Sequence, residues 1–263
     1  LLSMVSHRIR QAHSAAKALG LRWFVALFIF GSLAVLVDPL EPHDFDIAVS
    51  RQVQSMSRLA WNSDEKPVVT IEDLRNGEFQ LSITHGDYVW TFFKVHSWFG
   101  EYPLVGMLIC LGLVIAGDRR AGLILLGIGL VGALSHFPMK LLIGRSRPHS
   151  GSVDYVFTVA PGHSFPSGHT LYYVIVFYFL FLWTRHTVPR SKRFLRFFLS
   201  TVSVAMFGLV GLARVFLGAH YFTDVLAGYL WGYLWVRLTT TWLYPEWTGR
   251  VVKTVVQATG REL

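Results

Sequence analysis

Three short segments carry the residues that could do chemistry, and each stands at the edge of a long apolar run. The first extends from Lys140 to Pro148 and ends in Arg147-Pro148. The second is the tetrapeptide Pro-Ser-Gly-His at positions 166–169. The third carries an arginine, a histidine and an aspartate, at Arg214, His220 and Asp224. Cationic, imidazole and carboxylate side chains in this combination are typical of a pocket that handles an anion.

The cations suit a phosphoryl group in particular. Such a group carries charge on its equatorial oxygens during transfer, so catalysis consists mostly of positioning and electrostatic stabilisation. Arg147 and Arg214 offer planar forks that can hold two oxygens each, and Lys140 offers a compact point charge. Ser167 and Gly168 offer a hydroxyl and an unhindered backbone N–H. A helix beginning there would direct its free N–H groups towards an anion.

The two histidines add the groups that phosphoryl transfer needs. His220 and Asp224 are four residues apart, so on a helix they share one face. That spacing lets the carboxylate orient the imidazole and stabilise its charged form, as in an activated nucleophile. His169 is available as a general acid.

Each feature has an ordinary explanation when it stands alone. A single Lys or Arg near the end of a membrane helix is usually an interfacial anchor. A single His is more often a hydrogen-bonded structural residue, and Pro-Ser-Gly-His can be a plain turn into a helix. The joint occurrence of all three segments, with these internal spacings, favours a functional site.

In this order the segments K-x6-R-P, PSGH and R-x5-H-x3-D resemble the signature of the type 2 phosphatidic acid phosphatase (PAP2) superfamily. That superfamily includes membrane lipid phosphatases and soluble vanadium haloperoxidases. The resemblance covers Lys140 to Asp224. It departs from the pattern at Ala213, where the family often has a serine before the arginine.

The resemblance implies an all-helical core of six spans, a pocket at the outer leaflet, and a phosphohistidine mechanism that needs no metal and no cofactor. By matching position, His220 is the expected nucleophile, Asp224 its orienting partner and His169 the acid. The expected phosphate cradle consists of Lys140, Arg147, Ser167, Gly168 and Arg214. Three further residues near these segments match no fixed position of the motif and are open candidates for head-group contacts: Arg145, His149 and His163.

Composition independently predicts a polytopic membrane protein. Of the 263 residues, 52% are hydrophobic and only 15% are charged, whereas soluble domains have about a quarter charged residues. The length allows one all-α, membrane-embedded domain over 1–263 with about six spans. The single cysteine, Cys110, excludes an intrachain disulfide and a cysteine metal site. The apolar runs are roughly 20–37, 102–117, 121–143, 169–184, 197–213 and 223–243.

Charge predicts the orientation of these spans. The first run follows basic residues and lacks a small-residue cleavage site, which predicts an uncleaved signal anchor. With both termini inside, the cytoplasmic segments carry 14 Lys and Arg against three acidic residues, as the positive-inside rule expects. The segment 38–102 then lies outside with a net charge of −6. This topology, in a bacterial-type inner membrane, brings all three motifs to the outer face.

The extracytoplasmic segment 38–102 is long for a loop. Phe45 to Leu59 has helical apolar spacing and predicts a surface helix. The stretch from Val68 to Thr84 is compatible with a short hairpin or with irregular structure. Tyr88 to Phe99 is rich in aromatic residues, which predicts either an interfacial helix beside the site or a simple aromatic belt.

The leading functional prediction is a lipid phosphate or pyrophosphate phosphatase acting at the outer face. Candidate substrates are undecaprenyl pyrophosphate, phosphatidylglycerol phosphate, phosphatidic acid and lipid A phosphate. A phosphotransferase with the same intermediate differs only in its acceptor. A transporter is disfavoured because the charges cluster at span ends rather than at the midplane, and a haloperoxidase because it would be soluble. The expected partners are the lipid substrate and the bilayer; the net charge of +8 follows from topology, so nucleic acid is not expected, and no obligate protein partner is inferred.

Overall fold

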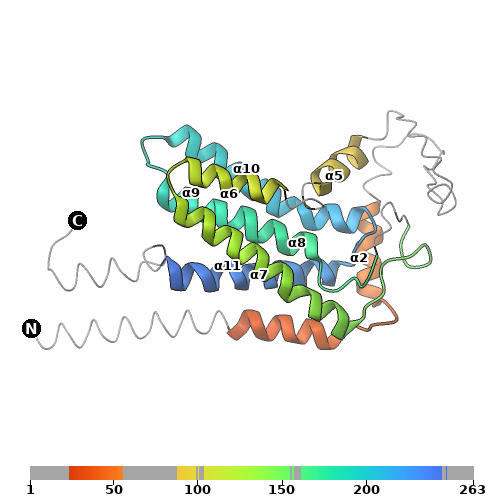
Figure 1. Ribbon diagram of the computed structural model, residues 1–263. Helices are drawn as coiled ribbons and strands as arrows, with labels where there is room; N and C mark the ends of the chain where they lie inside the picture. Colours follow the sequence, from red (N-terminus) through yellow and green to blue (C-terminus); the bar gives the residue numbers. More distant parts are fainter. Residues whose placement is uncertain are drawn as a thin grey trace, which may run out of the picture.

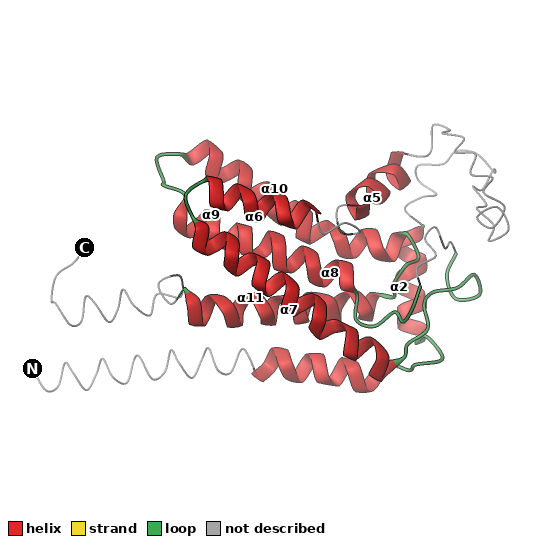
Figure 2. Ribbon diagram, viewed as in Figure 1, coloured by secondary structure: helices red, strands yellow, loops and turns green. Residues whose placement is uncertain are grey.

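The structure is a computed structural model that describes residues 24–55, 88–98, 100, 104–154, 156, 161–244 and 247. These residues form helices and connecting loops, with no strand among them (Figure 2). The prediction of an all-α protein is therefore confirmed for the part of the chain that the structure describes.

The helices fall on the six apolar runs of the sequence, with two more helices in the segment 38–102 (Figure 1). A short π-helical stretch joins α8 to α9, so these three elements follow one another without a loop. In chain order the elements are Phe24–Leu36, α2 (Asp44–Gln54), α5 (Tyr88–Trp98), α6 (Leu104–Ile115), α7 (Arg119–Ile143), α8 (Gly168–Tyr173), η1 (Val174–Tyr178), α9 (Phe179–Thr187), α10 (Arg193–Phe216) and α11 (Phe222–Leu243).

Two of these helices, α7 and α10, are long and apolar enough to cross a membrane. The helix Phe24–Leu36 and α6 are apolar but shorter. Large hydrophobic side chains on these elements are exposed, among them Leu130 and Phe137 on α7 and Phe194 and Phe197 on α10. An apolar exterior of this extent is typical of a protein surrounded by hydrocarbon.

The rod formed by α8, η1 and α9 lies in the middle of the bundle, in contact with α7, α10 and α11. Two glycines let α11 approach it closely. A Cβ on Gly228 would lie 2.6 Å from the carbonyl oxygen of Ser167, and one on Gly232 would lie 3.0 Å from that of Leu171. Neither position has room for a side chain, so the first half of α11 lies backbone to backbone against α8.

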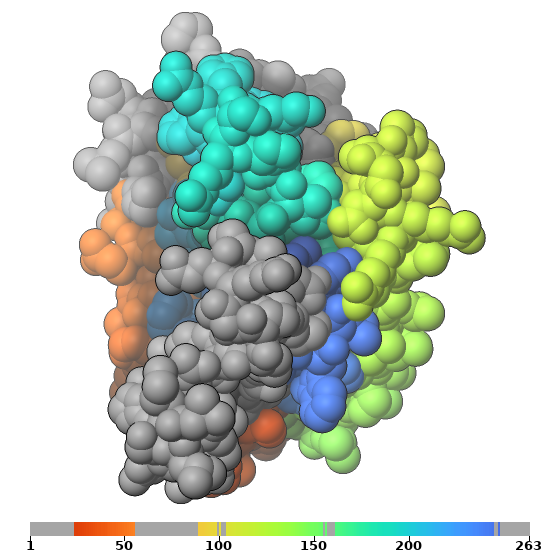
Figure 3. All heavy atoms as spheres, turned by 90° about the vertical axis from the view of Figure 1, so that its left-hand side faces the viewer, coloured from red at the N-terminus to blue at the C-terminus, as the bar shows by residue number. Residues whose placement is uncertain are grey.

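The three motifs gather at one end of the bundle. The α7–α8 and α10–α11 connections lie there, together with α2 and α5 (Figure 1). The α6–α7 and α9–α10 connections lie at the opposite end, which faces the viewer in Figure 3. That end carries exposed cations, Arg119, Arg120, Arg185, Arg190 and Lys192.

Two stretches of the segment 38–102 that were expected to be helical are helices. Most of the predicted surface helix, up to Gln54, appears as α2, and the aromatic-rich stretch appears as α5; both pack against α10. The stretch Val68 to Thr84 lies outside the described residues.

Candidate active site

A cavity of about 290 Å³ opens where the three motifs meet. Part of its lining is apolar, with Ala133, Leu171 and Ile175. The rest includes cationic and imidazole side chains. Its polar lining consists of His136, Lys140, Arg147, His169, Tyr172 and His220.

The end of α7 places the first two cations. Gly144 caps the helix with φ +67°, a left-handed conformation that favours glycine. Both cations donate hydrogen bonds to backbone carbonyls of residues 161–164, the segment that precedes α8. Lys140 Nζ donates to the carbonyl of His163 at 2.5 Å, and Arg147 Nε donates to that of Gly162 at 3.0 Å. Both charged groups are thereby held at the wall of the cavity.

The second motif opens α8, as its sequence predicts. Ser167 is the N-cap residue, and its buried hydroxyl accepts from the backbone N–H of Thr170 at 3.4 Å and from the Thr170 hydroxyl at 3.0 Å. Gly168 and His169 line the cavity. Among the described residues, the buried Nε2 of His169 has no hydrogen-bond partner. This nitrogen is therefore available to exchange a proton with a bound molecule.

The third motif differs in one respect from its prediction. His220 does not share a helix face with Asp224, because α11 begins only at Phe222. Tyr221 is the N-cap, and Asp224 accepts from its backbone N–H at 2.9 Å. The two side chains nevertheless meet, with His220 Nδ1 3.7 Å from Asp224 Oδ2. The pairing therefore comes from the cap of the helix and not from its periodicity.

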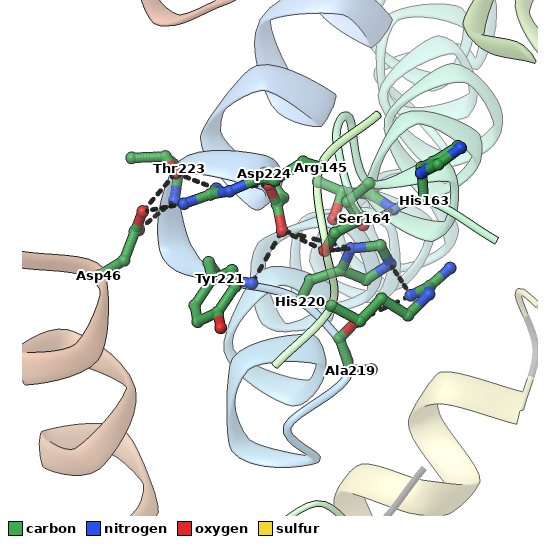
Figure 4. Close-up of polar contacts among 12 residues, drawn as sticks. Asp46, Arg145, His163, Ser164, Ala219, His220, Tyr221, Thr223 and Asp224 are labelled. Carbon is green, nitrogen blue, oxygen red and sulfur yellow. Dashed lines mark hydrogen bonds and ion pairs between the residues drawn. The ribbon is translucent and has the colours of Figure 1, made fainter. Parts of the chain in front are cut away.

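Ser164 completes this pair (Figure 4). Its hydroxyl lies 2.5 Å from Asp224 Oδ2 and 3.3 Å from His220 Nδ1. A carboxylate can only accept, so the single hydroxyl proton goes to Asp224 and the oxygen accepts from Nδ1–H. The lone pair of His220 is then on Nε2, which faces Arg147 Nη1 at 3.3 Å. In this tautomer the unprotonated nitrogen faces the Arg147 guanidinium, which also lines the cavity.

The surroundings favour a neutral imidazole. Burial lowers the pKa of His220 well below its usual value, and the nearby cations Arg147, Arg214 and Lys140 lower it further. Nucleophilic attack needs an unprotonated nitrogen, and burial together with these cations favours that form of His220.

Arg214 lies behind the cavity wall rather than on it. It is buried at the end of α10, and its Nη1 donates to the hydroxyl of Ser97 on α5 at 2.5 Å. Of the eight residues predicted for the site, five line the cavity, and Ser167, Arg214 and Asp224 do not.

The three open candidates lie elsewhere as well. Arg145 is buried between the carboxylates of Asp46 and Asp224, at 2.7 and 2.6 Å. His149 is in an exposed turn, and His163 meets Lys140 only through its carbonyl oxygen. None of the three lines the cavity.

Sequence reasoning missed several residues of the site. His136 lines the cavity one helical turn before Lys140, and this four-residue spacing on an apolar helix was a usable signal. Ser164 contacts Asp224 across 60 positions of sequence, Ser97 contacts Arg214 across 117, and Asp46 contacts Arg145 across 99. No local pattern marks them.

Residues 120–247 match the model of the PAP2 superfamily. Over this part, just under half of its length, the chain is similar to the PAP2 superfamily. The matched range contains all three motifs and every side chain of the polar cavity lining.

A relative supports this similarity. Phosphatidylglycerophosphatase B of Bacillus subtilis (strain 168) is 31% identical over 136 residues, which are 50% of this chain and 62% of the relative. The match thus spans less than two thirds of that relative's length.

The PAP2 fold is also seen in a crystal structure. The structure of a transmembrane PAP2-type phosphatidylglycerolphosphate phosphatase from Bacillus subtilis aligns with a TM-score of 0.61 and 18% identity. The alignment covers 85% of this chain and 96% of that one. The fold at least is shared over nearly the whole of the solved protein.

Proposed function

We propose that this protein is an integral membrane phosphatase that hydrolyses lipid phosphates or pyrophosphates through a phosphohistidine. One observation carries the proposal: Lys140, Arg147, His169 and His220 surround a single cavity at one end of a helical bundle with an apolar exterior. The cavity combines cationic residues that can bind phosphate with apolar residues that can contact the beginning of a lipid chain. Similarity to the PAP2 superfamily supports the same chemistry.

In the first step, the Nε2 lone pair of His220 attacks phosphorus. The bond from phosphorus to the leaving oxygen breaks, and His169 donates a proton to that oxygen. Lys140 and Arg147 stabilise the equatorial oxygens. Arg214 lies behind them and adds positive charge, Gly168 leaves room for the anion, and Ser167 holds the start of α8.

In the second step, water attacks the phosphohistidine. His169 accepts a proton from the water, the phosphorus–nitrogen bond breaks, and its electron pair returns to Nε2. Inorganic phosphate and the original protein result. The carboxylate of Asp224, acting through Ser164, stabilises the positive charge that His220 carries between the two steps.

Phosphatidylglycerol phosphate is the first substrate to test, because both similar proteins are named for this lipid. Undecaprenyl pyrophosphate, phosphatidic acid and lipid A phosphate complete the panel. We place the helices as six spans with the cavity at the outer face. The cationic opposite end supports this orientation, since basic residues concentrate on the cytoplasmic side.

The test is phosphate release by the purified protein in detergent, with each lipid offered in the presence of EDTA. Activity is expected to survive chelation, because Lys140 and Arg147 already supply positive charge. Within the described residues, no group of three or more His, Cys, Asp or Glu could hold a metal ion. An added alcohol acceptor distinguishes the phosphotransferase. Absence of phosphate release from every lipid would overturn the proposal.

A further inference from the structure

A buried chain of charges runs behind His220, from the segment 38–102 to the third motif (Figure 4). Arg145 Nη2 lies 2.7 Å from Asp46 Oδ2, and Arg145 Nη1 lies 2.6 Å from Asp224 Oδ1. All three side chains are at most 1% exposed. They come from three separate elements: α2, the loop after α7, and α11.

Neighbouring groups hold this chain in one geometry. The hydroxyl of Thr223 accepts from Arg145 at 2.7 Å and donates to Asp46 at 2.7 Å. The backbone N–H of Thr223 donates to the other carboxylate oxygen of Asp46 at 2.9 Å. The guanidinium also lies over the ring of Tyr221, 4.6 Å from its centroid. The cluster is therefore built into the start of α11, directly beside the nucleophile.

We propose that Asp46 and Arg145 are positioning residues that set the charge presented to His220 through Asp224. The inference rests on the proposed function, in which His220 is the nucleophile. Two carboxylates and one guanidinium give the cluster a net charge of −1. Asp224 faces Arg145 with one oxygen and the Ser164–His220 pair with the other. The cluster can thus stabilise the charged phosphohistidine without holding the free imidazole in its protonated form.

The balance is delicate because several other groups act on His220. Cations on three elements oppose its protonation, and one carboxylate favours it. The charged and titratable groups that face it are Lys140 on α7, Arg147 in the following loop, His169 on α8, Arg214 on α10 and Asp224 on α11. One unit of charge added or removed behind Asp224 therefore shifts the imidazole's protonation in a defined direction.

The experiment changes this charge in both directions. Arg145→Gln makes the cluster −2, Asp46→Asn makes it neutral, and the double variant restores −1. The readout is the acidic limb of kcat/KM against pH, which reports deprotonation of the free nucleophile. We expect Arg145→Gln to move the limb to higher pH, by on the order of one pH unit. Asp46→Asn is expected to move it to lower pH, and the double variant to return it close to the wild-type position.

A purely structural role predicts another outcome. Loss of buried contacts would lower activity in all three variants but leave the limb where it is. Finding the limb within a few tenths of a unit in folded Arg145→Gln would therefore overturn the proposal. If Arg145→Gln does not fold, the double variant compared with Asp46→Asn isolates the same charge, and an unmoved limb between those two has the same meaning.

Exposed residues on α2, the helix that carries Asp46, provide matched controls. Asp44→Asn and Arg51→Gln repeat the two substitutions on the exposed side of α2 and are expected to leave the limb unmoved. His220→Ala separates the two levels of inference. If it retains turnover, the proposed mechanism fails. If His220→Ala is inactive but the acidic limb of the Arg145 and Asp46 variants does not follow the charge of the cluster, only the role of Asp46 and Arg145 fails.

Discussion

The hydroxyl of Ser164 stands between Asp224 and His220, 2.5 Å from the carboxylate and 3.3 Å from the imidazole. The direct separation of the two side chains is 3.7 Å, too long for a good hydrogen bond. Orientation of the proposed nucleophile therefore passes through a serine that lies outside the three motifs.

Removing this hydroxyl should impair the chemical step. Ser164→Ala leaves His220 Nδ1–H without its acceptor, and loss of one hydrogen bond to a charged group costs about 1.5–3 kcal/mol. We expect kcat to fall roughly tenfold to a hundredfold, with KM little changed. Ser152→Ala is the matched control, because Ser152 is also buried but bonds to the Tyr221 hydroxyl. Equal losses in both variants would mean that the serine only supports the loop.

The two cavity-lining histidines of the motifs should fail in different ways. His220→Ala is expected to release no phosphate, because the covalent step has lost its nitrogen. His169→Ala is expected to lose roughly a hundredfold to ten-thousandfold in rate, and to accumulate phosphoenzyme when the leaving group is a good one. Radiolabelled phosphate on the denatured protein measures this accumulation. His149→Ala, in an exposed turn, serves as the control.

Anion binding should be coupled to proton uptake. Burial and the cations hold the pKa of His220 well below its usual value. A bound dianion offsets Lys140 and Arg147, so that pKa rises and a proton is taken up. Affinity for sulfate, whose own charge stays constant, should therefore increase as the pH falls through the raised pKa, by at most about tenfold per pH unit.

Calorimetry in two buffers with different heats of ionisation measures this uptake directly. The His220→Asn variant is expected to take up less than the wild type when sulfate binds. If sulfate binding were independent of pH and of the buffer, the imidazole would not be sensing the anion.

Gly228 should tolerate no side chain. The Cβ of an alanine would lie 2.6 Å from the Ser167 carbonyl, a backbone atom that cannot move alone. We expect Gly228→Ala to destabilise the fold by roughly 1–3 kcal/mol and to displace the cap of α8 beside the cavity. Gly127→Ala on α7, where nothing lies within 4 Å, is the control. Thermal unfolding in detergent and phosphate release together measure both effects.

Chemical labelling can test the proposed orientation. In a Cys110→Ala background, a cysteine substituted for Ser150 lies in the exposed turn near the cavity, and one substituted for Ser191 lies in the exposed α9–α10 connection. A membrane-impermeant thiol reagent should modify Ser150→Cys in intact spheroplasts. It should modify Ser191→Cys only after the membrane is broken, and the reverse pattern would invert the proposed topology.

The helices were predictable from sequence because their apolar runs are long and uninterrupted. The residue at which α11 begins was not predictable. Its N-cap is Tyr221, whereas Ser, Thr, Asp and Asn are the usual signals. The sequence therefore offered no sign that the helix begins after His220 rather than before it.

The residues that line the cavity were largely predictable, since charge and imidazole stand out against apolar surroundings. The residues that hold these lining residues in place were not predictable. Asp46 is one of two acidic residues in the first turn of an amphipathic helix, and Asp44 beside it is exposed. Only tertiary packing, across 99 positions of sequence, distinguishes the two.

The proposed phosphate cations already donate hydrogen bonds to backbone carbonyls. Lys140 donates to the His163 carbonyl, while Arg147 donates to the carbonyls of Pro161, Gly162 and Ala219. An arriving phosphate must compete with these oxygens, so part of the electrostatic gain on binding is offset by bonds given up. When phosphate leaves, the same carbonyls take its place, and the cations need not wait for water to solvate them. In the proposed mechanism, the carbonyls of residues 161–163 and of Ala219 thus substitute for the product, an arrangement that favours rapid release over tight retention.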